Sequence, residues 1–318
     1  MHDSLNNEAN MSENNTVKSI ADINTMNDLV FKFIFGSKER KGYTISLLNS
    51  VLLSDLKTSI VDLSFIDREH PTEKDKGKST RFDVACQLDN GTTVIVEVQL
   101  VDQKDAVSRM LYYWAKKYAD QLESGQTYSE LKPVYLVAIL NFKLHENPSL
   151  HTHCIIYNPE EKQRETDQFS IHWIEVPKLD VHQDLSQKSQ LERWVAFFDN
   201  RKLSESERNN LMTDMTINQA YSEIDRFFAD KKQRDAYEAR ERQYRDYISD
   251  MTAAKAEGIA EGIAEGIAEG KAKGIAEGKA ERNIEVARVC LKKGFDTATI
   301  CELTQLSPEV VEALRSEV

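Results

Sequence analysis

The chain has 318 residues, of which 40% are hydrophobic and 30% charged, and its formal net charge is −12. This apolar content excludes wholesale disorder and suffices for two or three modules. The acidic balance argues against binding nucleic acid through bulk positive charge alone. The charge is uneven, because residues 21–143 hold 16 basic and 17 acidic side chains, a net of −1, against −9 for residues 144–318. Any surface for a polyanion is therefore expected in the N-terminal half.

The sequence favours a cytoplasmic protein with no membrane partner. Its longest apolar run, Val134–Leu140, has seven residues, whereas a bilayer requires about 20. The polar, Asn-rich residues 1–20 have no apolar signal-peptide stretch. Four widely spaced cysteines without a CxxC pair argue against a disulfide framework and a cysteine-built zinc cluster.

Apolar periodicity predicts a mixed α/β domain over 21–250, preceded by a disordered leader over 1–20. Helical spacing alternates with strand patterns along the domain, and its end is predicted to be helical. The predicted helices are 27–36, 43–53, 104–122 and those within 185–250, and the predicted strands are 81–88, 92–100, 134–141 and 169–176.

A Gly-Ile-Ala-Glu repeat of period four fills residues 253–282 and contains six of the chain's twelve glycines. Each glycine costs a helix about 1 kcal/mol relative to alanine, whereas the alanines and glutamates favour a helix. The segment 251–283 is therefore either a spacer of variable length or a marginal helix that packs on its counterpart in a second copy.

Residues 284–318 predict a small three-helix unit that resembles a helix-turn-helix. Gly294 can end its first helix, Asp296 or Thr297 can cap the second, and Ser307-Pro308 can begin the third. The last helix carries three glutamates and one arginine, whereas a DNA-reading helix usually meets phosphates with basic residues. A homo-oligomeric or other protein contact is therefore favoured over DNA reading.

The two central strands predict a hairpin with the three-residue loop 89–91. A two-residue Asn90-Gly91 turn would place Phe82 opposite Gln99 and mix apolar with polar faces. The longer loop pairs 82 with 98, 83 with 97 and 84 with 96, and Gly91 suits its left-handed position. Phe82 then belongs to the apolar face, and Asp83 and Glu97 lie side by side with Gln99 next along the same face.

Two opposed carboxylates on a sheet repel each other unless a cation lies between them. Mg²⁺ prefers oxygen ligands and can activate water at a phosphodiester. The alternative is a solvent-facing polar surface that carries two acids. A different pattern, His151-x-His153-Cys154, suggests zinc, but no fourth ligand with matching spacing accompanies it, so a zinc site is not favoured.

These residues resemble the D…ExK core of PD-(D/E)XK phosphodiesterases, with Asp83 followed by Glu97-Val98-Gln99. More closely, the chain resembles the Rpn (recombination-promoting nuclease) transposase-like family over roughly 20–250. The segments that carry this resemblance are Asn27–Gly36, Arg81–Val84, Val96–Gln99, Arg109–Trp114, Pro133–Leu136 and Ile174–Lys178. The resemblance implies a restriction-endonuclease-like core, a mixed sheet flanked by helices, with a helical C-terminal extension.

The same resemblance implies a set of catalytic residues and ligands. Asp83 and Glu97 would bind Mg²⁺ or Mn²⁺ with the Val98 backbone carbonyl, and Gln99 would stand where the wider superfamily has lysine. Glutamine has no positive charge to favour hydroxide, so another cation is needed. The accessory candidates are Lys32, Arg109 and Lys116 as replacement cations, and Asp28 as a further ligand.

The hypothesis from the sequence is a Mg²⁺-dependent DNA endonuclease of the recombination-promoting type. The missing lysine motivates a first alternative, a weak or inactive DNA-binding or recombination-accessory protein. The helices and the repeat motivate a second, a protein-interaction scaffold.

Overall fold

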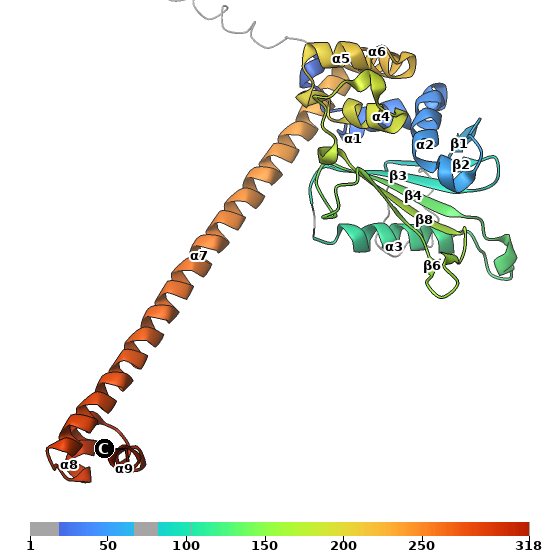
Figure 1. The fold of residues 1–318 in the computed structure, drawn as a ribbon. Coiled ribbons are helices and arrows are strands. Elements are labelled where there is room, and N and C mark those ends of the chain that lie inside the picture. Colours follow the sequence, from blue (N-terminus) through green and yellow to red (C-terminus); the bar gives the residue numbers. More distant parts are fainter. Residues whose placement is uncertain (1–18, 67–81, 103, 318) are drawn as a thin grey trace, which may run out of the picture. The chain divides into compact units, whose positions relative to one another are not determined.

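The computed structural model describes residues 19–66, 82–102 and 104–317 (Figure 1). The chain divides into two compact units, and the boundary lies between Glu241 and Arg242, inside one long helix. Each unit is described by itself. The predicted leader falls outside the described residues except for Ser19 and Ile20, and Ile20 already begins a 3-10 turn.

A six-stranded mixed sheet in the order β1-β2-β3-β4-β8-β5 forms the centre of the first unit. Strands β3, β4 and β8 run parallel, whereas β1, β2 and β5 pair antiparallel with their neighbours. The strands are β1 (Leu63–Phe65), β2 (Val84–Leu88), β3 (Thr93–Gln99), β4 (Val134–Leu140), β5 (His151–Cys154) and β8 (Phe169–Glu175), and a separate ribbon pairs β6 (Tyr157–Asn158) with β7 (Gln163–Arg164).

The β2–β3 hairpin has the predicted register. Val84 pairs with Val96, and the loop 89–91 closes with a hydrogen bond from the Gly91 N–H to the Leu88 carbonyl and a φ of 86° at Gly91. The prediction for Phe82 was wrong. Because β2 begins only at Val84, Phe82 leaves the alternation and packs on the opposite face, edge-on to Tyr113.

Helices cover both faces of the sheet (Figure 1). The larger core packs α1, α2, α4 and α6 against one face, through side chains such as Phe35, Val96 and Trp194. The smaller core packs α3 against the other face, around Ile95 and Met110. The helices of this unit are α1 (Asp28–Phe35), α2 (Lys41–Leu56), α3 (Ala106–Ala119), α4 (Gln190–Phe198), α5 (Glu205–Leu211) and α6 (Met215–Ala229).

The predicted α/β class, a mixed sheet flanked by helices with a helical extension, is confirmed. The main predicted elements recur with ends shifted by up to three residues. Strands β1 and β5 and the small β6–β7 ribbon were not predicted, because these strands have only two to four residues, too few for an apolar pattern to stand out. The sequence analysis also missed 3-10 turns at Ile20–Asp22, Lys38–Arg40, Tyr128–Glu130, Val176–Lys178, Leu185–Gln187 and Asn200–Lys202.

The repeat is helical and forms part of α7 (Lys231–Lys292), which has 62 residues. In the second unit, the end of α7 packs with α8 (Thr297–Thr304) and α9 (Pro308–Arg315) around Ile300 and Val311. The helix ends and caps predicted for this unit are observed. Gly294 has a φ of 81°, Asp296 caps α8 by accepting from the Thr299 N–H, and Pro308 begins α9.

No helix among the described residues is both long and apolar enough to cross a membrane. The apolar side chains of the first unit are instead used in the two cores that flank the sheet.

Candidate active site

Asp83 and Glu97 meet on the sheet face that α3 covers. Asp83 directly precedes β2, whose first pair joins Val84 to Val96, and its carboxylate accepts from the N–H of Val98, the neighbour of Glu97 in β3. Both residues are buried, with 8% and 3% of their surface exposed. The alternative of a solvent-facing polar surface is therefore wrong, because both acids are buried.

Two donors hold the Asp83 carboxylate. The Val98 N–H donates to its Oδ2 over 2.9 Å, and Lys32 Nζ lies 2.9 Å from its Oδ1. Lys32 reaches the site from α1, where Asn27 caps the helix by accepting from the Leu29 N–H. The first helix thus places a positive charge directly beside the first acid.

Asp28 lies one turn before Lys32, with 3.5 Å between Oδ2 and the lysine Nζ. Its carboxylate also accepts two hydrogen bonds from Arg240 of α7, over 2.9 and 2.8 Å. Burial raises the pKa of Asp28, but the bonds and charges of Arg240 and Lys32 outweigh burial and leave that pKa below its ordinary value. Asp28 is therefore a fully paired acid at the rim of the site.

Glu97 is poorly paired, in contrast to Asp83. Its buried Oε1 has no hydrogen-bond partner among the described residues, and its Oε2 meets the Gln99 amide only at 3.5 Å. Burial, and next the charge of Asp83, raises the pKa of Glu97 well above its ordinary value, and these effects outweigh the backbone hydrogen bond from Asp83 and the charge of Lys32, which lower it. The site therefore disfavours a second negative charge unless a cation enters.

The donors at this point fit a hard divalent cation. An orphaned buried carboxylate oxygen beside a second carboxylate is an arrangement that a positive ion would satisfy. In a strand, the carbonyl and the N–H of one residue point toward the same neighbouring strand. Because the Val98 N–H donates to Asp83, the Val98 carbonyl also points toward the side on which Asp83 lies. Asp83, Glu97 and the Val98 carbonyl thus offer the all-oxygen set that suits Mg²⁺ or Mn²⁺.

Two of the three predicted replacement cations contact residues of the site, and the third, Lys116, lies further away. Lys32 contacts Asp83, and the guanidinium of Arg109, on α3, donates to the side-chain oxygen of Gln99. Lys116 lies seven residues beyond Arg109, about 10 Å further along the helix axis. Lys32 is therefore the cation nearest the acids, and Arg109 orients the glutamine.

Glu175 is another buried acid near the same end of the sheet. It belongs to the segment Ile174–Lys178 that carries the family resemblance, but no role was predicted for it. It lies at the end of β8, opposite Leu140 of β4. It accepts from the backbone N–H groups of Leu144 and His145, from the His145 ring and from Lys178, over 2.7 to 3.1 Å. Despite burial, these donors hold the pKa of Glu175 below its ordinary value.

A recess of about 560 Å³ adjoins Glu175 at the carboxyl ends of β4 and β8. Gln99 ends β3 at the same edge, because the Asn141 N–H that follows β4 donates to the Gln99 carbonyl. The lining residues are Lys143, Leu144, His145, Glu146, Asn147, Pro148, Pro177 and Lys178.

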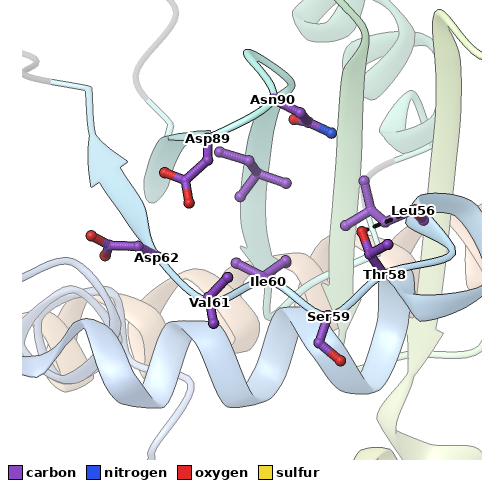
Figure 2. Close-up of a pocket in the computed structure, with 9 residues that line it drawn as sticks. Leu56, Thr58, Ser59, Ile60, Val61, Asp62, Asp89 and Asn90 are labelled. Atoms are coloured by element: carbon purple, nitrogen blue, oxygen red, sulfur yellow. Dashed lines mark hydrogen bonds between the residues drawn. The ribbon is translucent and has the colours of Figure 1, made fainter.

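A second hollow, of about 160 Å³, lies at the other end of the β2–β3 hairpin (Figure 2). The residues that form it are Leu56, Thr58, Ser59, Ile60, Val61, Asp62, Leu88, Asp89 and Asn90. None of the predicted site residues lines it, so it is separate from the acid pair.

The mixed sheet and the sequence Asp83…Glu97-Val98-Gln99 have the arrangement of a PD-(D/E)XK nuclease core. Among protein families, a model described as PD-(D/E)XK nuclease family transposase matches residues 25–254. The chain therefore belongs to this family, which confirms the resemblance. No curated protein and no solved structure gave a significant match.

Proposed function

We propose that the protein is a divalent-metal-dependent DNA endonuclease of the recombination-promoting type. One observation carries this proposal: Glu97 and Asp83 are buried side by side, and one oxygen of Glu97 has no partner among the residues that the structure describes. A fold maintained only for its stability gains nothing from an unpaired buried acid, which costs free energy without a partner. Membership in a nuclease family supports the same function.

In this proposal, Asp83, Glu97 and the Val98 carbonyl hold Mg²⁺ or Mn²⁺. The bound ion supplies the Lewis acidity that lowers the pKa of water and stabilises charge on the phosphodiester. Lys32 brings the positive charge that Gln99 lacks, because its ammonium already lies at Asp83. Arg109 fixes the side-chain oxygen of Gln99, so the Gln99 amide N–H₂ remains directed to the site and can orient a water.

We place the DNA backbone along the carboxyl edge of the sheet. The exposed Lys143 lines the recess there, and in open α/β sheets ligands commonly bind outside the carboxyl ends of the strands. A lysine at this edge can contact a phosphate and help to position the backbone without reading bases. This restricted contact agrees with a chain whose net charge is negative.

A DNA-binding protein that cleaves weakly or not at all is the alternative that one observation favours. Gln99 stands at the lysine position of the wider superfamily, and Lys32 is already engaged with Asp83 and Asp28. If that pairing keeps the ion out, the same edge would bind DNA without hydrolysis.

We also propose that the repeat in α7 pairs with the repeat of a second copy. Four isoleucines of the repeat, Ile259, Ile263, Ile267 and Ile275, are 53–66% exposed. The repeat glycines have open space around them, and each lowers the stability of an isolated helix. A second copy of the chain carries the same repeat and therefore offers the same small and apolar faces. We therefore propose a second copy as the partner of the repeat.

Plasmid nicking tests the enzymatic proposal. Supercoiled plasmid is incubated with purified protein and Mg²⁺ or EDTA, using wild type, Asp83→Ala and Glu97→Ala. The exposed Asp89→Ala, at the far end of the same hairpin, is the matched control. We expect metal-dependent nicking in wild type and Asp89→Ala, and none in the two site variants. Nicking that survives in both site variants contradicts the assignment, and a folded, DNA-binding but inactive wild type supports the alternative.

A further inference from the structure

A second polar cluster lies on the sheet face opposite α3. It consists of Asp55 from the last turn of α2, His153 from the edge strand β5 and His172 from β8, and we call it the Asp–His cluster. His153 and His172 are directly paired across the two strands. Asp55 Oδ2 lies 2.8 Å from His172 Nε2 and 3.2 Å from His153 Nε2. Three ligand-type atoms from three elements therefore converge on one point.

The hydroxyl of Ser170 lies within hydrogen-bond distance of all three ligand atoms. Its Oγ lies 2.8 Å from His172 Nε2, 2.9 Å from His153 Nε2 and 2.9 Å from Asp55 Oδ2. Asp55 and His172 have almost no exposed side-chain surface, with 2% and 0%. Two of the three ligands are thus held inside the fold, and the third, His153, lies at its edge.

From this geometry we propose that the Asp–His cluster binds one first-row transition-metal ion of the Zn²⁺ type. Two imidazoles and one carboxylate are a frequent three-ligand set for zinc. Ligands about 2.0 to 2.1 Å from a tetrahedral ion lie roughly 3.3 Å apart, close to the separations of 2.8 and 3.2 Å from Asp55 Oδ2. Imidazole donors favour such an ion over Mg²⁺, so this site differs in chemistry from the all-oxygen set at Asp83 and Glu97.

The surroundings orient two of the three ligands. His172 Nδ1 lies 2.9 Å from His151 Nε2, so the His172 tautomer with its proton on Nδ1 donates to His151 and leaves Nε2 for the ion. Arg164 Nη1 lies 2.6 Å from Asp55 Oδ1, so Oδ2 is the oxygen that faces the two histidines and accepts from the Ser170 hydroxyl. Hydrogen bonds of this kind from neighbouring residues hold metal ligands in place.

The ion can enter beside His153, whose side chain is 30% exposed at the sheet edge. Once bound, it ties the edge strand β5 to β8 and to the end of α2. The expected role is to stabilise this edge of the fold, because the cluster lies apart from the acid pair, on the other face of the sheet.

Metal retention by the full, tag-free chain tests this proposal. Protein stripped with EDTA is loaded with Zn²⁺, passed over a chelating resin and analysed by mass spectrometry for metal. We expect about one Zn²⁺ per chain and a Tm that rises with added Zn²⁺, as for any ligand that binds only the folded state. Loading with Co²⁺ should give the visible absorption of a four-coordinate ion.

The variants assign the site. His153→Gln changes an exposed edge residue that the fold can lose, and it should abolish retention, the Tm rise and the cobalt spectrum. His182→Gln is the matched control, since His182 is also an exposed histidine beside a carboxylate, that of Glu207 at 2.9 Å. It should behave as wild type, as should Glu97→Ala. A wild type that keeps no Zn²⁺ and shows no Tm rise overturns the proposal, as does a His153→Gln variant that keeps it.

Discussion

Two buried glutamates near one end of the sheet have opposite environments. Glu97, in β3, has one oxygen without a partner in the described part of the chain and lies beside Asp83, and its pKa is raised. Glu175, at the end of β8, receives four hydrogen bonds, and its pKa is lowered. Burial alone therefore does not distinguish a structural acid from a candidate catalytic one. The number of donors around the carboxylate distinguishes the two kinds of acid, because the donors decide which protonation state the fold favours.

The largest expected effect is the loss of cleavage in Glu97→Gln. The amide keeps the shape of the side chain but removes the charge that holds the cation, so we expect activity to fall at least about 100-fold. Without metal, the same variant should be more stable than wild type by about 1 kcal/mol near neutral pH, because folded Glu97 must take up a proton that the neutral amide does not need. Plasmid nicking and chemical denaturation in EDTA measure the two effects.

The sign of the stability effect follows from the raised pKa of Glu97. Folded Glu97 keeps a proton that the unfolded chain releases above its ordinary pKa of 4.5. The stability of the wild type therefore falls as pH rises above that value, and the advantage of Glu97→Gln should grow with pH. A Glu97→Gln variant that is less stable than wild type in EDTA would show that the acid is structurally satisfied.

The next effect in size is the destabilisation caused by Glu175→Gln. The substitution removes a charge that stabilises Lys178 and His145, and breaking a buried ion pair costs about 3 to 5 kcal/mol. Chemical denaturation at pH 7 measures the loss. The stability that Glu175 contributes is present above its ordinary pKa of 4.5 and is lost as pH falls through its lowered pKa. Wild type and variant should therefore converge in acid; a constant difference down to pH 3 would contradict the pairing.

A smaller effect is expected on DNA binding from Lys143→Ala, which changes the recess beside Glu175 without touching either glutamate. Losing one phosphate contact should weaken binding at every sequence and reduce the salt slope by about 0.9. Fluorescence anisotropy in EDTA over a range of salt concentrations measures both. The exposed Lys57→Ala, next to the hollow at the other end of the hairpin, is the matched control. Equal slopes for the two variants would place the DNA elsewhere.

The sequence predicted what local pattern determines. Strict alternation in two neighbouring strands and one glycine gave the hairpin register, and therefore the pairing of Val84 with Val96 and the position of Asp83. Where alternation stops, prediction failed. Phe82 lies before β2, which begins only at Val84, and packs on the other face of the sheet.

The rest depends on contacts between distant residues. Asp55 and His172 lie far from His153 along the chain, and β5 is a polar strand recognisable only by its pairing with β8. The sequence therefore offered no further ligand for His153, although the fold provides two. Likewise, the donors around Glu175 come from the loop after β4 and from a 3-10 turn, and no spacing rule connects them. The arrangement of donors, and hence the difference between the two glutamates, appears only in the folded chain.

The smallest effect on either glutamate is expected from deleting 257–280, inside the repeat of α7. The deletion lies beyond the contact unit that contains both acids, so the unfolding of that unit should change by less than about 0.5 kcal/mol. The oligomeric mass measured by light scattering should fall, because the exposed isoleucines are removed.

A variant of unchanged length separates pairing from spacing. Glutamine at Ile259, Ile263, Ile267 and Ile275 keeps the helix but removes its apolar side chains, and it should lower the mass as the deletion does. If cleavage follows mass in both variants, two copies of the nuclease unit act together at one DNA site. If cleavage falls only in the deletion, the length of the repeat matters and its apolar face does not. Identical masses for all three proteins would reduce the repeat to a spacer, because identical exposed faces would then have failed to pair.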